Sequence, residues 1–264
     1  MLSSNDDDGV KMETFFKRLL KGFKNPIQGF LYILGTGWKS DKVESSLLSN
    51  SPIDFVVHVG GHLAQELDLY RILGVQHIVW IEADPSTFVK LEKKLKILEA
   101  EQVKKIKHTV INATISDEDG KEVDFYVFNN KGGSSSIKKP GKLMSKTYPH
   151  LSVIGEPLRL KTSRLDTILS SIHFSKNKSK KNLLVLDIQG NEGAALKGLG
   201  DCHKMFSMIQ SEISRKALYQ DSTMFIDIDG WMKERDFKLL SHSYLYIPWH
   251  CDVVYQKKSF DLTY

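Results

Sequence analysis

Cysteine is scarce in this chain of 264 residues, which contains only Cys202 and Cys251. The two do not form a Cys-x-x-Cys pair, so the sequence has no readable zinc site or thioredoxin-type motif. A disulfide scaffold is excluded too, because a chain of this length buries enough surface to fold without cross-links. Two free thiols indicate a reducing compartment, and we expect a cytoplasmic protein.

Long apolar runs are also absent. The chain starts Met-Leu-Ser-Ser-Asn-Asp-Asp-Asp, whereas a secretory signal has basic residues followed by an apolar run. The most apolar early stretch, at residues 29–34, is far shorter than the roughly 18 apolar residues of a membrane-spanning helix, and no later stretch reaches that length. The sequence therefore predicts neither a secretory signal nor a transmembrane segment.

Charge of one sign does not dominate, because 37 Lys and Arg stand against 32 Asp and Glu, a net charge of +5. Hydrophobic residues make up 41% and charged residues 26%, as in ordinary globular proteins, which excludes a disordered or collagen-like chain. The length fits one large domain or two small ones. The mild positive charge permits an anionic partner without requiring one, and we expect no nucleic acid partner.

The first 52 residues form an expected extension before a main domain at residues 53–264. Residues 1–9 are acidic and are typical of a disordered tail. At residues 11–24 the apolar side chains recur at helical spacing, which predicts a helix that packs on the main domain or anchors to a partner or membrane surface. Residues 25–52 are rich in Gly and Ser and predict a connecting arm.

In the main domain, short apolar runs alternate with helical patterns. Strands are expected at residues 54–59, 77–81 and 108–115, with helices at 63–73 and from Asp84, a fitting N-cap before Pro85, to Leu98. Strands joined in this way by helices lie parallel in one sheet. The predicted fold class is therefore α/β, with a mostly parallel central sheet and helices on both faces.

The alternation resumes after an expected hairpin and a long loop. The turn signal at residues 117–120 predicts that the run at 123–128 closes a hairpin with the strand before it. Residues 129–150, rich in Gly, Ser and Lys with two prolines, predict a long loop of the kind that forms lids. Further strands are expected at 183–188, 206–213, 237–240 and 253–256, and helices at 192–199 and from Ser222 onward.

Three polar groups follow the predicted strands: Gly60-Gly61-His62, Glu82 and Asp187. Open α/β sheets bind ligands at the carboxyl ends of their strands. The glycine pair lets a ligand approach the backbone, and the next helix start offers unpaired N–H groups. Glu82, about 20 residues further on, can accept hydrogen bonds from both hydroxyls of a ribose. These groups together predict a cofactor that contains adenosine.

The glycine turn lacks the Gly-x-Gly-x-x-Gly pattern of NAD-binding proteins. It reads Gly-Gly-His-Leu-Ala from Gly60 to Ala64, so the third glycine is missing, and Glu66 follows shortly after. The Glu66 carboxylate would repel a pyrophosphate. A cofactor without phosphate, such as S-adenosylmethionine, suits the site better.

The sequence around these groups resembles the FkbM-type methyltransferases. Phe-Val-Val-His-Val-Gly-Gly-His-Leu-Ala-Gln-Glu at residues 55–66 resembles their first motif, and Val-Trp-Ile-Glu-Ala-Asp-Pro at 79–85 their second. Further matches follow in family order: residues 112–117, 133–136, 165–168, 186–190 with Glu192, Glu212 with Leu218 and Tyr219, and 251–255. No single motif is decisive, but the order of the motifs across roughly Ile53 to Lys257 is specific.

The resemblance implies a Rossmann-like class I methyltransferase that uses S-adenosylmethionine. The cofactor-binding roles that it implies are these: Gly60 and Gly61 shape the methionine end, Glu82 binds the ribose, Ala83, Asn112 and Ala113 flank the adenine, and Asp187 lies beside the methyl group. Two departures stand out, because the family usually has Asp in place of His58, and Asn-x-Gly in place of His62-Leu63-Ala64. His58 and His62 stay candidate cofactor contacts, with a satisfied core histidine as the alternative for His58.

Family members mostly methylate hydroxyl oxygens, often on sugars, so the resemblance implies an O-methyltransferase for a sugar, glycan or related acceptor. A sugar hydroxyl is a poor nucleophile and benefits from a base or a metal that removes its proton. The candidates are Asp187, Glu212, His250 and Asp252, and Asp187 ranks first because it ends an apolar strand. An alternative is that Asp187 only caps the next helix.

Two further interpretations stay open around this site. Asp187 and Glu212 together are a candidate site for a divalent cation, although two carboxylates do not define one. Trp249, in a Pro-Trp-His turn, is a candidate for stacking on a sugar ring or for the core, whereas Trp80 and Trp231 are expected in the core.

Two other functions compete with a glycan methyltransferase. The basic balance suggests a methyltransferase for RNA or cap structures, but no dense Lys/Arg face with interleaved aromatics is readable beside the pocket. The departures at His58, His62 and Ala64 suggest a non-catalytic scaffold that binds a nucleoside or a protein partner. Retention of Glu82 and Asp187 favours an enzyme.

Overall fold

The computed structural model describes residues 43, 46, 47, 52–101, 106–172, 174, 181–242 and 250–260. The predicted helix at residues 11–24, the predicted tail and most of the arm, and Trp249 lie outside these residues. The boundary between an extension and a main domain at residue 53 therefore stays a prediction. No helix of the described residues is long and apolar enough to cross a membrane.

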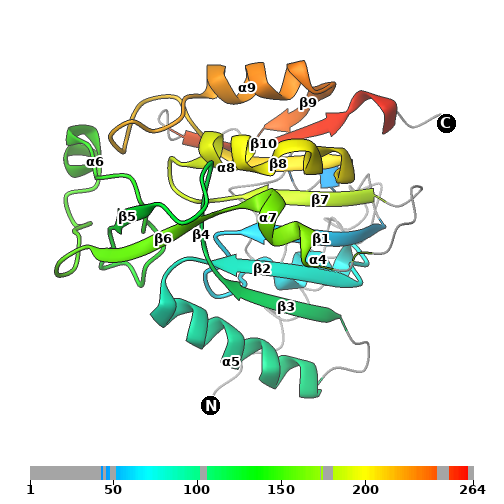
Figure 1. Cartoon of the computed structure of the whole chain (residues 1–264), viewed down its shortest axis with the longest axis horizontal. Coiled ribbons are helices and arrows are strands. Elements are labelled where there is room, and N and C mark those ends of the chain that lie inside the picture. The colour runs from blue at the N-terminus through cyan, green and yellow to red at the C-terminus, as the bar shows by residue number, and fades with distance from the viewer. Residues whose placement is uncertain are drawn as a thin grey trace, which may run out of the picture.

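The described strands and helices alternate along the chain (Figure 1). The strands are β1 (Ile53–Val59), β2 (His77–Glu82), β3 (Lys107–Asn112), β4 (Thr114–Ser116), β5 (Glu122–Phe125), β6 (Leu158–Arg164), β7 (Lys181–Leu186), β8 (Met208–Ser214), β9 (Phe237–His242) and β10 (His250–Lys257). The helices are α4 (Leu67–Ile72), α5 (Pro85–Glu101), α6 (Lys142–Thr147), α7 (Leu165–Ser170), α8 (Glu192–Leu199) and α9 (Phe225–Glu234), with 3-10 turns η1 (Gly200–Met205) and η2 (Lys258–Phe260).

Seven of the described strands form one central sheet in the order β3-β2-β1-β7-β8-β10-β9. The first five of these lie parallel, and β10 runs antiparallel to both β8 and β9. The strand order reverses between β1 and β7, where a ligand site is expected in such a sheet. The prediction of a Rossmann-like, mostly parallel sheet is confirmed.

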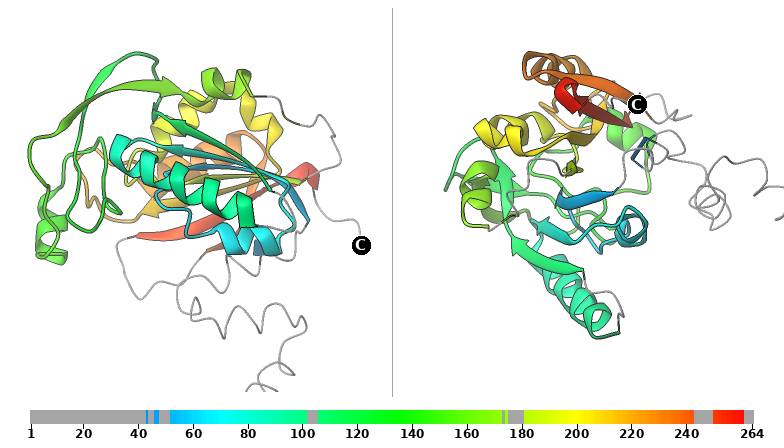
Figure 2. Two further views of the ribbon diagram at one scale, coloured as in Figure 1. Left: turned by 90° about the horizontal axis from the view of Figure 1, so that it is seen from below. Right: turned by 90° about the vertical axis from the view of Figure 1, so that its right-hand side faces the viewer.

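Helices cover both faces of this sheet, because alternate residues of each strand point to opposite sides. Phe55, Val57 and Val59 of β1 pack with residues of α7, α8 and α9, whereas Val56 packs with residues of α4 and α5. In the right-hand view of Figure 2, α8 in yellow and α4 in cyan lie on opposite sides of the strands. Trp80 is fully buried on the α4 side, as predicted for a core residue.

The predicted hairpin at residues 123–128 is wrong. After β4, the turn at 117–120 leads the chain to the far edge of β6, so a second sheet has the order β4-β6-β5. β4 lies parallel to β6 and β5 lies antiparallel to it. β6, which the sequence analysis missed because most of its residues are exposed or half-buried, thus separates the two strands that were expected to pair.

Several predicted boundaries shift for local reasons. The strand expected at residues 108–115 is split, because β3 pairs with β2 in the central sheet whereas β4 leaves it and pairs with β6. The helix expected from residue 63 begins at Leu67, since Ala64 has a left-handed φ of 51° that no α-helix accepts. The helix expected from Ser222 begins at Phe225.

The segment at residues 129–150 packs more closely than predicted for a long loop. It contains the short helix α6, and Met144 of that helix is buried with Phe128, Leu218 and Tyr219 in a small core of their own. The Gly141 nitrogen donates to the Leu218 carbonyl oxygen at 2.8 Å. The segment at residues 129–150, with α6 at the left of Figure 1, is thus held by contacts with Leu218 and Tyr219, which follow β8.

Candidate functional site

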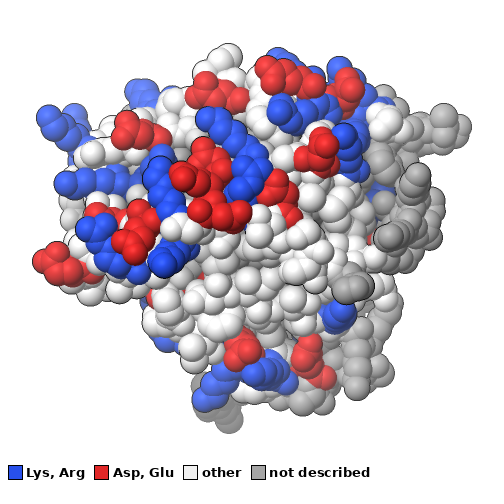
Figure 3. All heavy atoms as spheres, viewed as in Figure 1, with Lys and Arg blue, Asp and Glu red and all other residues white. Residues whose placement is uncertain are grey.

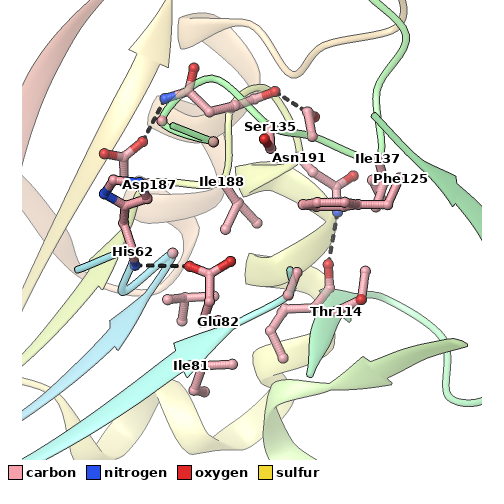
Figure 4. A pocket seen from close by; sticks show the side chains of 18 of the residues that line it. His62, Ile81, Glu82, Thr114, Phe125, Ser135, Ile137, Asp187, Ile188 and Asn191 are labelled. Carbon is pink, nitrogen blue, oxygen red and sulfur yellow. Dashed lines mark hydrogen bonds between the residues drawn. The ribbon is translucent and has the colours of Figure 1, made fainter. Parts of the chain in front are cut away.

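A pocket of about 340 Å³ opens at the carboxyl ends of β1, β2 and β7. It lies where the strand order reverses, so the sheet topology places it at the expected ligand site. Of the predicted cofactor residues, Gly60, His62, Glu82, Ala83, Ala113 and Asp187 line it. Figure 4 shows Glu82 and Asp187 on one side of this pocket and Phe125, Thr114 and Asn191 on the other.

Glu82 is the acid at the end of β2, and its side chain is almost fully buried. Its Oε2 accepts a hydrogen bond from the His62 nitrogen at 2.8 Å, and its Oε1 accepts one from the Asp84 nitrogen at 2.9 Å. Burial raises the pKa of Glu82, and these two N–H donors oppose the rise. Each carboxylate oxygen has two acceptor positions, so each keeps one for a ligand hydroxyl.

The glycine turn after β1 brings the backbones of β1 and β7 into close contact. Gly60 has φ of +89°, and a Cβ atom there would lie 1.9 Å from the Asp187 carbonyl oxygen. Only glycine fits this position. Gly61 lies against Trp80 and Leu91 instead and is not among the residues that line the pocket, and its expected role at the methionine end stays a prediction.

The end of the pocket opposite Asp187 is largely apolar. Ile81, Ala83, Ala113, Ile115, Phe125 and Ile137 are among its lining residues. Asn112 does not line it, because its Nδ2 donates to the carbonyl oxygens of Glu82 at 2.8 Å and Ala83 at 3.1 Å. Asn112 therefore stabilises the backbone at the end of β2. The apolar lining residues beside it suit an adenine ring.

His58 is a core residue and does not line the pocket. It is 3% exposed, its Nδ1 lies 2.8 Å from the Tyr70 hydroxyl, and its ring stacks on Trp80 with centroids 5.2 Å apart. Burial lowers the pKa of His58, so the ring is neutral near pH 7. These contacts fit the alternative of a satisfied core histidine rather than a cofactor contact.

Three of the four predicted catalytic side chains, Asp187, Glu212 and His250, are linked through Gln189. The Gln189 Nε2 donates to Asp187 Oδ1 and to Glu212 Oε2, each at 2.7 Å. The other oxygen of Glu212, Oε1, lies 2.7 Å from His250 Nδ1. Asp252 lies opposite Glu212 in the ladder between β8 and β10.

Asp187 lines the pocket, and its side chain is exposed there. Desolvation by the surrounding protein, and then the charges of Glu212 and Asp252, raise the pKa of Asp187 well above its usual range. A carboxylate in this position suits the role of a general base.

Gln189, Tyr219 and Tyr148 complete the hydrogen-bonded network, and the sequence predicted no role for them. The Tyr219 hydroxyl lies 2.9 Å from Gln189 Oε1 and 2.8 Å from the Ser134 carbonyl oxygen. The Tyr148 hydroxyl lies 3.4 Å from His250 Nε2. Gln189 and Tyr219 fall inside matched motifs, which could have marked them, whereas no sequence signal pointed to Tyr148.

The segment at residues 129–137 is held over the pocket at several points. The His62 Nε2 lies 2.8 Å from the Lys131 carbonyl oxygen, and the Ser136 hydroxyl donates to the Gln189 carbonyl oxygen at 2.8 Å. Gln65 Nε2 donates to His62 Nδ1 at 2.6 Å, so the His62 proton sits on Nε2 and is donated to Lys131. His62 thus contacts the pocket and this segment at once.

Comparisons with known proteins agree with this geometry. The family model described as Methyltransferase FkbM domain matches residues 58–239. The crystal structure of methyltransferase FkbM from Methylobacillus flagellatus KT aligns with a TM-score of 0.53 and 15% identity, over 94% of this chain and 60% of that one. This chain therefore spans about 60% of that relative's length. At 15% identity, this similarity shows that the two chains share a fold.

A second solved structure, that of magnesium protoporphyrin IX methyltransferase from Synechocystis PCC 6803 with bound SAM, aligns with this chain with a TM-score of 0.44 and 10% identity. The alignment covers 97% of this chain and 100% of that one. No curated protein matches this sequence.

Proposed function

This chain belongs to the FkbM methyltransferase domain family, and on that premise we propose that it transfers a methyl group from S-adenosylmethionine to a hydroxyl of a sugar, glycan or related small acceptor. The observation that carries the proposal is the pocket at the β1, β2 and β7 ends, which has Glu82 at its centre and Asp187 at one end. The cytoplasmic location expected from the sequence stays a prediction.

The pocket residues fit S-adenosylmethionine by their chemistry. The free acceptor positions on the two Glu82 oxygens match the two hydroxyls of a ribose. The apolar cleft with Ala83, Ala113 and Phe125 suits the adenine ring, and the glycine turn leaves room for the methionine part. When bound, the sulfonium group supplies an activated methyl group, and the protein has to align the acceptor with it.

Asp187 is the proposed general base. Its Oδ1 accepts from Gln189, whereas its Oδ2 accepts no hydrogen bond from the described residues, and the exposed side chain lines the pocket. An acceptor hydroxyl beside Oδ2 would give up its proton to this oxygen as its own oxygen forms the new bond to the methyl carbon. Glu212, His250 and Asp252 lie behind Asp187 as further proposed participants.

The distribution of charged side chains on the surface favours a sugar over a nucleic acid as the acceptor. On the face drawn in Figure 3, Lys and Arg side chains are interleaved with Asp and Glu rather than gathered in a basic stripe. Nucleic acid binding depends on clustered positive charge. The Asn130 amide and the Ser135 hydroxyl at the pocket suit a neutral polyhydroxylated acceptor.

Two measurements test the proposal. Calorimetric titration with S-adenosylmethionine separates a methyltransferase from a scaffold that binds another ligand. A screen of sugars, glycans and RNA with a labelled methyl donor then identifies the acceptor class. We expect binding of the cofactor and label on a sugar hydroxyl; label on RNA alone, or cofactor binding without turnover on any acceptor, would contradict the proposal.

A further inference from the structure

Two carboxylates on neighbouring parallel strands meet at a single amide nitrogen. Asp187 directly follows β7, and Glu212 lies in β8 beside it. Gln189 Nε2 donates one hydrogen to Asp187 Oδ1 and the other to Glu212 Oε2, at 2.7 Å each. Both hydrogens of the amide are therefore used to hold the two acids together.

The two carboxylates fix the orientation of this amide, because ionised carboxylates only accept hydrogen bonds and so face its NH₂ group. At the other end, the Tyr219 hydroxyl lies 2.9 Å from Gln189 Oε1 and 2.8 Å from the Ser134 carbonyl oxygen, and its one hydrogen is shared between them. The Gln189 backbone has a left-handed φ of 56°, which residues with a Cβ rarely adopt. The Ser136 hydroxyl, which donates to the Gln189 carbonyl oxygen, helps to hold this conformation.

A divalent cation shared by the two acids would need the space that this nitrogen occupies. Such ions lie about 2.0–2.6 Å from carboxylate oxygens and take six or more oxygen ligands. Glu212 Oε1 is already bonded to His250 Nδ1 at 2.7 Å. Among the described residues, no group of three or more His, Cys, Asp or Glu side chains could hold a metal ion. The residues present therefore do not fit a bridging cation.

We propose that Gln189 is a positioning residue whose amide takes the place of a bridging cation between Asp187 and Glu212, so that the reaction requires no metal at this pair. The inference rests on the proposed function, in which Asp187 takes the proton of the acceptor. By binding Oδ1, Gln189 fixes one oxygen of the Asp187 carboxylate, leaves Oδ2 for the acceptor, and stabilises the charged form of Asp187. It also offsets the repulsion between the two acids.

The electrostatic surroundings of Asp187 give this role a measurable consequence. The carboxylates of Glu212, Asp252 and Glu192 all favour its protonated form, whereas the Gln189 hydrogen bond favours the charged one. The phenols of Tyr70 and Tyr219 also interact with Asp187. Loss of the amide therefore shifts the ionisation of the base to higher pH.

The first test needs no acceptor. Wild-type protein and the Gln189→Glu variant are titrated calorimetrically with MgCl₂ and with MnCl₂. We expect no binding to the wild type, and Mn²⁺ binding at least about tenfold tighter in the variant, because a third carboxylate then replaces the amide. Saturable Mg²⁺ or Mn²⁺ binding to the wild type that Asp187→Asn abolishes would overturn the proposal.

The second test uses turnover with the acceptor found in the screen. We expect the wild type to be unaffected by EDTA and Gln189→Leu to lose at least about tenfold in kcat. In Gln189→Leu, the acidic limb of the profile of kcat against pH should also move to higher pH by about one unit. A merely structural defect would lower kcat without moving this limb. The control is Gln220→Leu, which replaces an exposed glutamine whose Nε2 donates to the Pro140 carbonyl oxygen at 3.4 Å.

The outcomes separate this inference from the proposed function. Absence of S-adenosylmethionine binding to the wild type would remove the proposed function and leave the metal titration to decide on Gln189. Activity that EDTA abolishes, or an unchanged pH profile in folded Gln189→Leu, would remove the role of Gln189 and leave the methyltransferase intact.

Discussion

The main-chain nitrogen of His62 donates a 2.8 Å hydrogen bond to Oε2 of Glu82, which joins the turn after β1 to the acid at the end of β2. The same histidine reaches the Lys131 carbonyl oxygen with its Nε2. One residue thus connects the proposed ribose-binding carboxylate with the segment over the pocket.

Glu82→Ala should weaken S-adenosylmethionine binding at least about tenfold. Two hydrogen bonds to a charged acceptor contribute about 1.5–3 kcal/mol each, and both would be lost. The variant also leaves the nitrogens of His62 and Asp84 without their acceptor, so a loss of stability is expected. Calorimetry on protein shown to be folded by circular dichroism measures the affinity.

The matched control for Glu82 is Glu122→Ala, which removes an exposed carboxylate of β5 outside the pocket. Its affinity should equal that of the wild type. An unchanged affinity in folded Glu82→Ala would remove the ribose-binding assignment.

His62→Ala should loosen the segment over the pocket. The variant removes the hydrogen bond to the Lys131 carbonyl oxygen, and a bond of this kind contributes about 0.5–1.5 kcal/mol. Amide exchange at residues 130–136 should become about 3- to 10-fold faster, while exchange in β6 of the same sample serves as the internal reference.

The same exchange measurement tests whether this segment acts as a lid. In the wild type, S-adenosylmethionine together with the acceptor should slow exchange at residues 129–150. Equal and strong protection with and without ligands would identify the segment as a fixed structural arm.

The sequence predicted the sheet and the pocket walls but not how the groups are connected. Glu82 and Asp187 could be found because each follows an apolar run, and parallel strands bring their carboxyl ends to one edge. The bridge through Gln189 could not be found, since it depends on a left-handed backbone at Gln189 and on Tyr219, 30 residues away.

The misplaced hairpin has a similar cause. β5 had a clear turn before it, but its partner β6 is largely exposed or half-buried and gives no apolar pattern. The pairing was therefore decided by contacts between distant segments. His58 was uncertain in the sequence because a buried histidine and a ligand-binding one look alike until Tyr70 and Trp80 are placed beside it.

Gly60→Ala should destabilise the fold by more than about 3 kcal/mol, because the new Cβ would lie 1.9 Å from the Asp187 carbonyl oxygen and the strand ends would have to separate. Gly120→Ala is the control, as Gly120 also has a positive φ, of +74°, but has nothing within 4 Å of the added Cβ. Its cost should be about 1–2 kcal/mol. Urea unfolding compares the two, and equal losses would show that φ alone matters at Gly60.

Glu192→Gln should make the protein more stable at pH 8. Glu192 is buried and accepts hydrogen bonds from the nitrogens of Ile188 and Gly190, and burial followed by the charge of Glu212 raises its pKa from 4.5 to about 7. The folded state therefore binds a proton that the unfolded state releases, so stability is complete below pH 4.5 and is lost as pH rises through about 7.

The glutamine variant lacks this titration. Above pH 7 it should exceed the wild type by up to about 3 kcal/mol, and the difference should vanish near pH 4. Urea unfolding across this range is the measurement. A wild type whose stability rises between pH 5 and pH 8 relative to the variant would reverse the sign and contradict the raised pKa of Glu192.

Asp187→Asn should reduce turnover at least about a hundredfold with near-normal S-adenosylmethionine affinity. A general base contributes a factor of about 10²–10⁴ in rate, and asparagine keeps the size of the side chain and an oxygen that accepts from Gln189. Because the wild-type pKa of Asp187 is raised, wild-type turnover should increase with pH as this group ionises, and the residual activity of the variant should lose that dependence. Single-turnover rates with labelled methyl donor measure the chemical step, and calorimetry measures the affinity.

Normal turnover in Asp187→Asn would place the base elsewhere among the predicted catalytic side chains. His250, which Glu212 contacts at 2.7 Å, would then be the next residue to replace, followed by Asp252.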